Sequence, residues 1–220
     1  MATDNEIWSY SELQTPKTPQ EFQETRKSFL EEMKNLVLSK DWKMESETDG
    51  TVMESHSNPG SNIHMTRCTR TFDDVSKFEN FADQLFDSSL EKKQAIYEDM
   101  LENKELKHID DKNHVVFSQF KAPFPTWKRE FVMLKSREVE KDGSHLITSC
   151  SINYEDSPFS KGFVRGVAKT AMLVTPLKEE NKIRVIKVDY VDPKGWIPIW
   201  LLNSLKGKSI NNINKMQGYL

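Results

Sequence analysis

The 220-residue chain has few of the residues that cross-link or punctuate a fold: two cysteines, eight glycines and nine prolines. Cys68 and Cys150 stand far apart, so they form neither a disulfide framework nor a zinc-binding set. The longest apolar run, 196–202, is much shorter than the roughly 20 residues of a membrane-spanning helix. The first ten residues contain no basic region followed by an apolar one, as a secretion signal would. We therefore predict a cytoplasmic chain without a membrane span.

Motifs that carry catalytic or cofactor chemistry are also missing. The sequence contains no glycine-rich nucleotide loop, no H-E-x-x-H, no C-x-x-C and no G-x-S-x-G. His56 and His64 flank one turn, but two surface histidines on neighbouring strands are far more common than a metal site. We predict no catalytic residues, no metal, no cofactor and no nucleic-acid partner. These patterns do not exclude an enzyme, but nothing among them supports one.

The charge is close to balanced in total and uneven along the chain. The net charge is −3, yet segments 157–178 and 193–220 each contain four basic residues and no acid, which leaves −11 for the remainder. If both segments share one face, that face would attract anionic lipid headgroups. The alternative is that these cations are scattered and solvated.

Hydrophobic periodicity predicts a mixed α+β chain. Thr18, Pro19 and Glu21 form a helix start, and apolar residues at helical spacing continue to about residue 38. Alternating segments predict strands at 42–47, 51–56 and 63–72, followed by helices from about residues 74 and 90. Further strands are predicted at 115–122, 131–139, 146–152, 163–174 and 183–191, with a final helix from about residue 197. No change in composition marks a second domain, so we predict an N-terminal arm, 1–17, and one domain, 18–220.

Three ordered motifs in the second half resemble those of the START (steroidogenic acute regulatory protein-related lipid transfer) domain family. The first is the proline-rich turn and strand A-P-F-P-T-W-K-R-E-F-V at 122–132. The second is K-G-F-V-R-G at 161–166, and the third is D-P-K-G-W-I-P-I-W-L-L-N at 192–203. The Pro-Phe-Pro turn is most similar to that of the phosphatidylcholine-transfer branch. The element order extends the resemblance to about residue 18.

The resemblance implies a helix-grip fold, in which a curved antiparallel sheet wraps a long C-terminal helix and encloses a tunnel for one lipid. It also implies a gate formed by that helix and the loop 153–161. The residues expected to bind lipid are Gln119, Met133, Lys135, Tyr154, Phe159, Val164, Leu201, Leu202 and Leu205. The family's usual acidic partner for Lys135 aligns near Gln119, so we expect the Lys135 ammonium to meet a lipid phosphate, to meet water, or to lose its proton.

A polar turn with an apolar tip next to a basic strand suits partial insertion at a membrane surface. The residues expected to touch an anionic membrane transiently are Pro158, Phe159, Lys161, Arg165, Lys206 and Lys208. A simple packed corner is an equal alternative for the tip.

The leading hypothesis is a monomeric, peripherally membrane-associated lipid-transfer protein that holds one phospholipid or sterol. A lipid sensor that binds without shuttling, and a helix-grip enzyme acting on an apolar substrate, are the alternatives. The energetics favour an enclosed site, because each methylene exposed to water costs about 0.8 kcal/mol.

Overall fold

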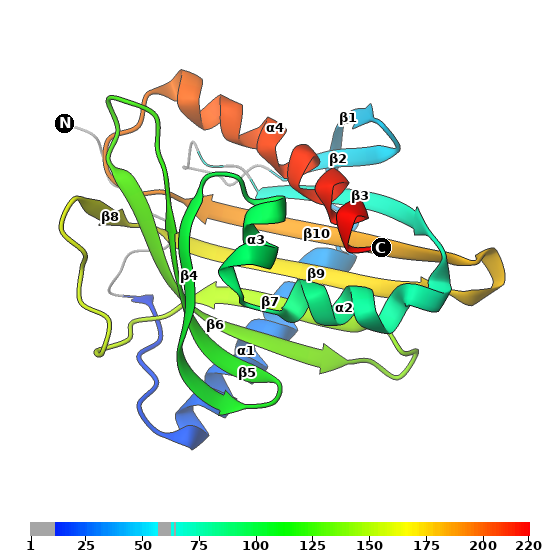
Figure 1. Cartoon of the computed structure of the whole chain (residues 1–220), viewed down its shortest axis with the longest axis horizontal. Coiled ribbons are helices and arrows are strands. Elements are labelled where there is room, and N and C mark those ends of the chain that lie inside the picture. The colour runs from blue at the N-terminus through cyan, green and yellow to red at the C-terminus, as the bar shows by residue number, and fades with distance from the viewer. Residues whose placement is uncertain (1–11, 57–62, 64) are drawn as a thin grey trace.

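A computed structural model describes residues 12–56, 63 and 65–220 of the chain, the side chains of 199–206 excepted. In this part of the chain, ten strands form one sheet in the order β1-β2-β3-β10-β9-β7-β6-β5-β4, with β8 pairing in parallel with β6 (Figure 1). All other pairs along that order are antiparallel. The strands are β1 (Lys43–Thr48), β2 (Thr51–His56), β3 (Met65–Asp73), β4 (Met100–Asp110), β5 (Asn113–Phe120), β6 (Lys128–Val139), β7 (His145–Ser151), β8 (Phe163–Arg165), β9 (Val167–Leu177) and β10 (Lys182–Asp192).

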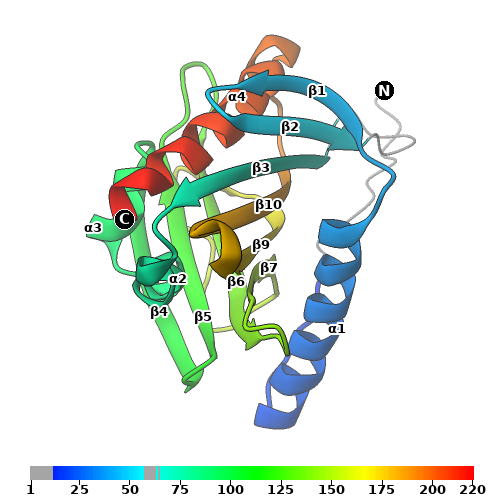
Figure 2. The same ribbon diagram turned by 90° about the vertical axis from the view of Figure 1, so that its right-hand side faces the viewer.

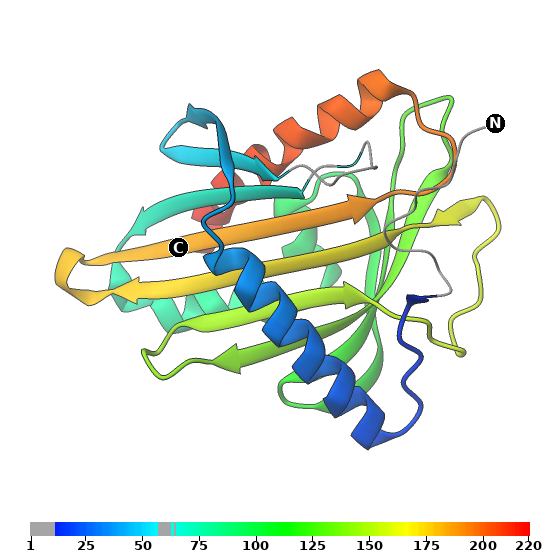
Figure 3. The same ribbon diagram turned by 180° about the vertical axis from the view of Figure 1, so that it is seen from behind.

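Helix α1 (Pro19–Leu38) covers one face of the sheet, which we call the outer face (Figures 2 and 3). Its start is set locally: the Thr18 hydroxyl accepts a hydrogen bond from the Glu21 backbone, and the Glu21 carboxylate accepts one from the Thr18 backbone. Phe22, Phe29 and Met33 point from α1 into an apolar cluster with residues of β5, β6, β7, β9 and β10.

The opposite, inner face is covered by three helices: α2 (Phe78–Phe86), α3 (Leu90–Ile96) and α4 (Ile199–Lys215) (Figure 2). The C-terminal half of α4 and the turn after it insert Ile213, Met216 and Tyr219 into a second apolar cluster. Phe72 and Phe81 from β3 and α2 belong to the same cluster, with ring centroids 5.4 Å apart. This packing attaches the C-terminal end of α4 firmly to the sheet.

The predicted helix-grip fold is confirmed, with two differences from the sequence prediction. Strand β4 was not predicted, because its sequence is polar, it lies at the edge of the sheet and three register shifts interrupt its pairing with β5. The single strand predicted at 163–174 is two, β8 and β9, separated at Gly166. A Cβ atom at Gly166 would lie 2.4 Å from a ring carbon of Phe131, so only glycine allows this close approach.

The division into an arm at 1–17 and a domain at 18–220 stays a prediction, because residues 1–11 lie outside the described part of the chain. Within the described part, residues just before α1 contact the loop after β7. The Asn153 backbone donates to the Gln14 carbonyl, and Lys17 pairs with Glu155 at 2.6 Å.

Candidate functional site: a cavity between the sheet and the C-terminal helix

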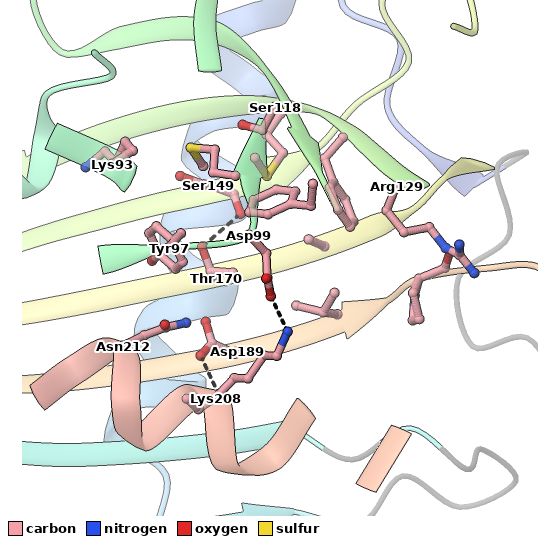
Figure 4. A pocket seen from close by; sticks show the side chains of 18 of the residues that line it. Lys93, Tyr97, Asp99, Ser118, Arg129, Ser149, Thr170, Asp189, Lys208 and Asn212 are labelled. Carbon is pink, nitrogen blue, oxygen red and sulfur yellow. Dashed lines mark hydrogen bonds and ion pairs between the residues drawn. The ribbon is translucent and has the colours of Figure 1, made fainter. Parts of the chain in front are cut away.

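A cavity of about 370 Å³ lies between the inner face of the sheet and helices α3 and α4 (Figure 4). This volume is at the lower end of the range for small-molecule pockets. Alternate residues of each strand point into it, and many of these are apolar. The apolar lining residues include Leu85, Met100, Val116, Phe120, Phe131, Met133, Ala168, Met172, Val191 and Ile197.

A polar belt crosses this apolar wall. Thr66, Asp189, Thr170, Ser149 and Lys135 are direct cross-strand partners on β3, β10, β9, β7 and β6, so they form one row across the inner face. All five line the cavity. The neighbouring row of inward-pointing residues lies nearer the β5–β6 loop. Its members that line the cavity are Val191, Ala168, Met133 and Val116, and all four are apolar. On strands β10, β9 and β6, one polar row therefore lies beside an apolar one.

Lys135 forms one end of the belt and caps a helix. It is 5% exposed, and its Nζ donates to the carbonyls of Phe86 and Asp87, at 2.6 and 3.1 Å, and to the Ser88 hydroxyl at 3.2 Å. The Lys93 ammonium does the same for the carbonyl of Leu85 at 2.8 Å. These carbonyls form the negative end of α2, which lysines stabilise.

Burial lowers the pKa of Lys135 well below its usual value and that of Lys93 to about 8. The three donors of Lys135 all have acceptors, so this ammonium positions α2 against β6. Of the three outcomes expected from the sequence, the lowered pKa agrees with easier loss of the proton, whereas the contacts of Lys135 with the end of α2 were not expected.

Lys187 and Asp189 are an ion pair near the other end of the belt, two residues apart on the inward face of β10. Burial alone would lower the pKa of Lys187, but the Asp189 carboxylate beside it holds that pKa above its usual value. Asp189 also accepts a hydrogen bond from the Ser209 hydroxyl of α4 at 3.2 Å, and Ser209 lies 3.4 Å from the Thr66 hydroxyl. The belt therefore continues from the sheet to the covering helix.

The mouth of the cavity is bordered by the β5–β6 loop, which contributes Lys121, Ala122, Pro123 and Thr126 to the lining. Lys208 of α4 reaches across and pairs with Asp99, just before β4 (Figure 4). Both side chains are about half exposed, at 47% and 45%. This pair connects the helix to the opposite rim.

The structure brings together only part of the predicted lipid-binding set. Met133 and Lys135 line the cavity. Gln119, Tyr154 and Val164 are not among its described lining residues: Gln119 donates to the Ser160 hydroxyl at 3.2 Å, and Tyr154 packs against the apolar cluster beneath α1. These three residues were expected in the tunnel wall, and the structure places them outside the described lining of the cavity. Leu201, Leu202, Leu205 and Lys206 belong to the side chains outside the described part.

The loop 153–161, expected to be part of the gate, contributes no described residue to the cavity lining. It is fixed from beneath by the buried side chains of Glu130 and Arg165, whose atoms lie 2.8 Å apart. Burial would raise the pKa of Glu130, but hydrogen bonds from Ser160 and Arg165 hold it below its usual value. Arg165 is 8% exposed, which corrects its expected role in membrane contact. Pro158, Phe159 and Lys161 are exposed.

Sequence reasoning missed three exposed aromatic residues at the same end of the molecule. Phe124, which is 94% exposed, and Trp127 belong to the β5–β6 loop, and Trp196 lies between β10 and α4. Both segments also line the cavity. The sequence does contain a signal for them. These three bulky aromatic residues stand in Pro-rich or Gly-containing segments, where no strand or helix would bury them.

The basic segments do not form one free cationic face. Besides Arg165, Lys169 pairs with Glu32 of α1 at 2.7 Å on the outer face, and Lys194 pairs with Asp192 at 2.8 Å. The cations that sequence counting placed together are partly neutralised by acids from elsewhere in the chain.

Comparison with known protein families agrees with this architecture. The START domain matches residues 21–217, almost the whole described chain. The chain belongs to the START domain family. Membership supports lipid binding or transfer in general terms. No curated protein matches this START domain.

Solved structures of START proteins share the fold at low sequence identity. Human StAR-related lipid transfer protein 5 superposes with a TM-score of 0.80 at 16% identity, covering 92% of this chain and 97% of that one. Human STARD10 gives 0.75 at 19% identity, covering 93% and 80%. A Xanthomonas axonopodis STAR-related lipid transfer protein gives 0.69 at 19% identity, covering 81% and 97%. At these identities the likeness shows the fold alone.

The described residues contain no group of three histidine, cysteine, aspartate or glutamate side chains placed to hold a metal ion. None of their helices is long and apolar enough to span a membrane.

Proposed function

We propose that this START domain holds one lipid in the cavity and transfers it between membranes. The cavity between the sheet and α4, with its apolar surface and its polar belt, is the observation that supports this function. A lipid places its apolar chains against such a wall, where each methylene removed from water gains about 0.8 kcal/mol. Because a bilayer offers the chains a similar apolar environment, exchange between the two sites needs no chemical step.

In this proposal the gate consists of α4 and the β5–β6 loop. The C-terminal half of α4 is held by the core residues Ile213 and Met216, whereas Lys208 attaches the helix to the rim through a half-exposed ion pair. Exposed ion pairs contribute at most about 1 kcal/mol, so this link opens easily. The loop 153–161 becomes part of the docking surface instead of the gate.

The docking surface consists of the exposed aromatic residues Phe124, Trp127, Phe159 and Trp196 with the lysines around them. Exposed Lys121 and Lys128 lie in and directly after the β5–β6 loop, and Lys161 follows Phe159. Aromatic side chains enter the headgroup region, while each nearby lysine adds about 1 kcal/mol of attraction to anionic lipid. Docking would bring the mouth of the cavity onto the bilayer.

Vesicle exchange tests the function. Purified protein is mixed with donor vesicles containing a fluorescent phospholipid and with unlabelled acceptor vesicles, and transfer is followed in time. We expect the protein to accelerate transfer and to carry about one lipid per chain in native mass spectrometry. Protein that stays free of lipid would contradict the proposal, and a bound lipid that never exchanges would favour the sensor alternative.

The gate is tested by exchanging charges across the rim. Lys208→Glu places two carboxylates opposite each other, so we expect transfer to become a few-fold faster as the helix loosens. Adding Asp99→Lys to Lys208→Glu recreates an ion pair and restores the original rate. If the single and double variants transfer lipid equally, the ion pair has no part in the gate.

A further inference from the structure

The polar belt indicates what kind of headgroup the cavity takes, and the following inference rests on the proposed lipid-binding function. The belt contains more hydrogen-bonding capacity than the described residues use. The hydroxyl of Ser149 makes no described hydrogen bond, and that of Thr170 makes only a long one, 3.4 Å to the Ser149 carbonyl. Both side chains are half-buried because they border the cavity.

Two further polar groups lie on the opposite side of the cavity. Tyr97, just after α3, and Asn212 of α4 line it close to Asp189 (Figure 4). Neither the Tyr97 hydroxyl nor the Asn212 amide has a described hydrogen-bond partner. Burial raises the pKa of the Tyr97 hydroxyl, and the Asp189 carboxylate raises it further, against the opposite effect of Lys187.

The polar groups of the belt, with Tyr97 and Asn212, favour a ligand that forms many hydrogen bonds. Hydroxyls and an amide both donate and accept hydrogen bonds, and the ion pair of Lys187 and Asp189 adds donors and acceptors without adding net charge. From Asp189 to Lys135 the belt crosses three strand spacings, a distance of about 14 Å along the sheet. A headgroup that satisfies the belt therefore needs several hydrogen-bonding groups distributed over its surface.

We infer that the cavity binds a lipid whose headgroup is a hydroxyl-rich ring, of the glycosyl or inositol type. The ring lies across Thr170 and Ser149 between Tyr97 and Asp189, and the acyl chains extend along the apolar row toward the mouth. A sterol brings one hydroxyl and leaves the other polar groups dry and unpaired, which is costly. The quaternary ammonium of choline donates no hydrogen bond, and the carboxylate of the belt is already paired with Lys187.

A competition experiment tests this inference. Delipidated full-length protein is incubated with phosphatidylcholine vesicles that contain equal amounts of glucosyl diacylglycerol, phosphatidylinositol and cholesterol. The protein is then isolated, and its lipid is identified by mass spectrometry. We expect one or both ring lipids to be enriched about tenfold over phosphatidylcholine and cholesterol. Preference for the glucosyl lipid assigns the belt to an uncharged sugar, and preference for phosphatidylinositol assigns it to an inositol phosphate.

Matched variants separate hydrogen bonding from shape. Thr170→Val removes the hydroxyl at constant volume and should lower the enrichment of ring lipids over phosphatidylcholine about three- to tenfold. Thr170→Ser keeps a hydroxyl and should retain the enrichment, while thermal unfolding checks that both variants are folded.

The headgroup assignment and the carrier function would fail with different results. Lipid bound without preference, a preference for phosphatidylcholine or cholesterol, or equal loss of all lipids in Thr170→Val would overturn the headgroup assignment and leave the carrier function standing. Protein that takes up no lipid from any vesicle would overturn both.

Discussion

The carboxylate of Glu130 on β6 and the guanidinium of Arg165 on β8 form an ion pair from which water is almost absent, with Glu130 fully buried. Arg165 donates to one Glu130 oxygen from Nε at 3.0 Å and from Nη2 at 2.8 Å. The same guanidinium donates to the carbonyls of Ser157 and Pro158, so the pair also fixes the loop that carries Phe159.

Breaking this pair should destabilise the domain. Glu130→Gln leaves a buried cation without its counter-charge, and we expect it to lower the free energy of unfolding by about 3 kcal/mol. Urea denaturation measures the change. Glu155→Gln is the control, because its partner Lys17 and Glu155 itself are both exposed, and a solvated ion pair contributes little to stability. Equal effects of the two substitutions would contradict the buried-pair account.

Stability should fall in mild acid because of His114. Burial, together with the nearby charge of Lys135, lowers the pKa of His114 to about 4, compared with about 6.5 in an unfolded chain. Between these values the unfolded state binds a proton that the folded state does not, so the free energy of unfolding decreases as the pH falls from 6.5 to 4. The loss from this one group is about 3 kcal/mol.

A substitution far from His114 serves as the control. His114→Gln should flatten the dependence of stability on pH between 6.5 and 4, whatever its effect at neutral pH. Val139→Ser should leave the slope as in the parent, because it replaces an exposed residue without a titratable group at the end of β6. Chemical denaturation at several pH values gives both slopes, and a slope unchanged by His114→Gln would refute the assignment.

Two glycines should respond in opposite ways to alanine. At Gly166 the added Cβ would overlap the Phe131 ring, so Gly166→Ala should lower stability by about 1–3 kcal/mol. At Gly207 in α4 the added Cβ meets nothing within 4 Å, and the better helix propensity of alanine should raise stability by up to about 1 kcal/mol. Thermal unfolding measures both. A stabilised Gly166→Ala protein would contradict the close approach of the Phe131 ring to residue 166 between β8 and β9.

The exposed aromatic residues at the mouth should affect transfer and not folding. Replacing Phe124 and Trp127 by serine removes apolar surface that has no packing role, so the melting temperature should stay within a degree or two. Transfer between anionic vesicles should slow about tenfold as membrane affinity falls. Val139→Ser is the control, because Val139 is exposed at the opposite end of β6. If both proteins transfer lipid at the same rate, the mouth does not dock through these residues.

Short-range physics explains what could be predicted from the sequence. The capping box at Thr18 acts over three residues, the turns between strands lie within a few residues, and apolar periodicity reveals which face of a helix is buried. Local motifs around Arg129, Arg165 and Pro193 also sufficed for the family resemblance. Strand β4 was missed because an edge strand with register shifts needs little apolar alternation.

The sequence by itself therefore determined most of the helices and strands, the family resemblance that implied the helix-grip fold, and the uneven distribution of charge. The tertiary structure alone decided where those charges and polar groups meet. Arg165 is neutralised by Glu130, 35 positions earlier, which turned an expected membrane contact into an internal anchor. Thr66, Lys135, Ser149, Thr170 and Asp189 form one belt because strand register aligns them. Register depends on the pairing of whole strands, so no local pattern around any one of the five could reveal it.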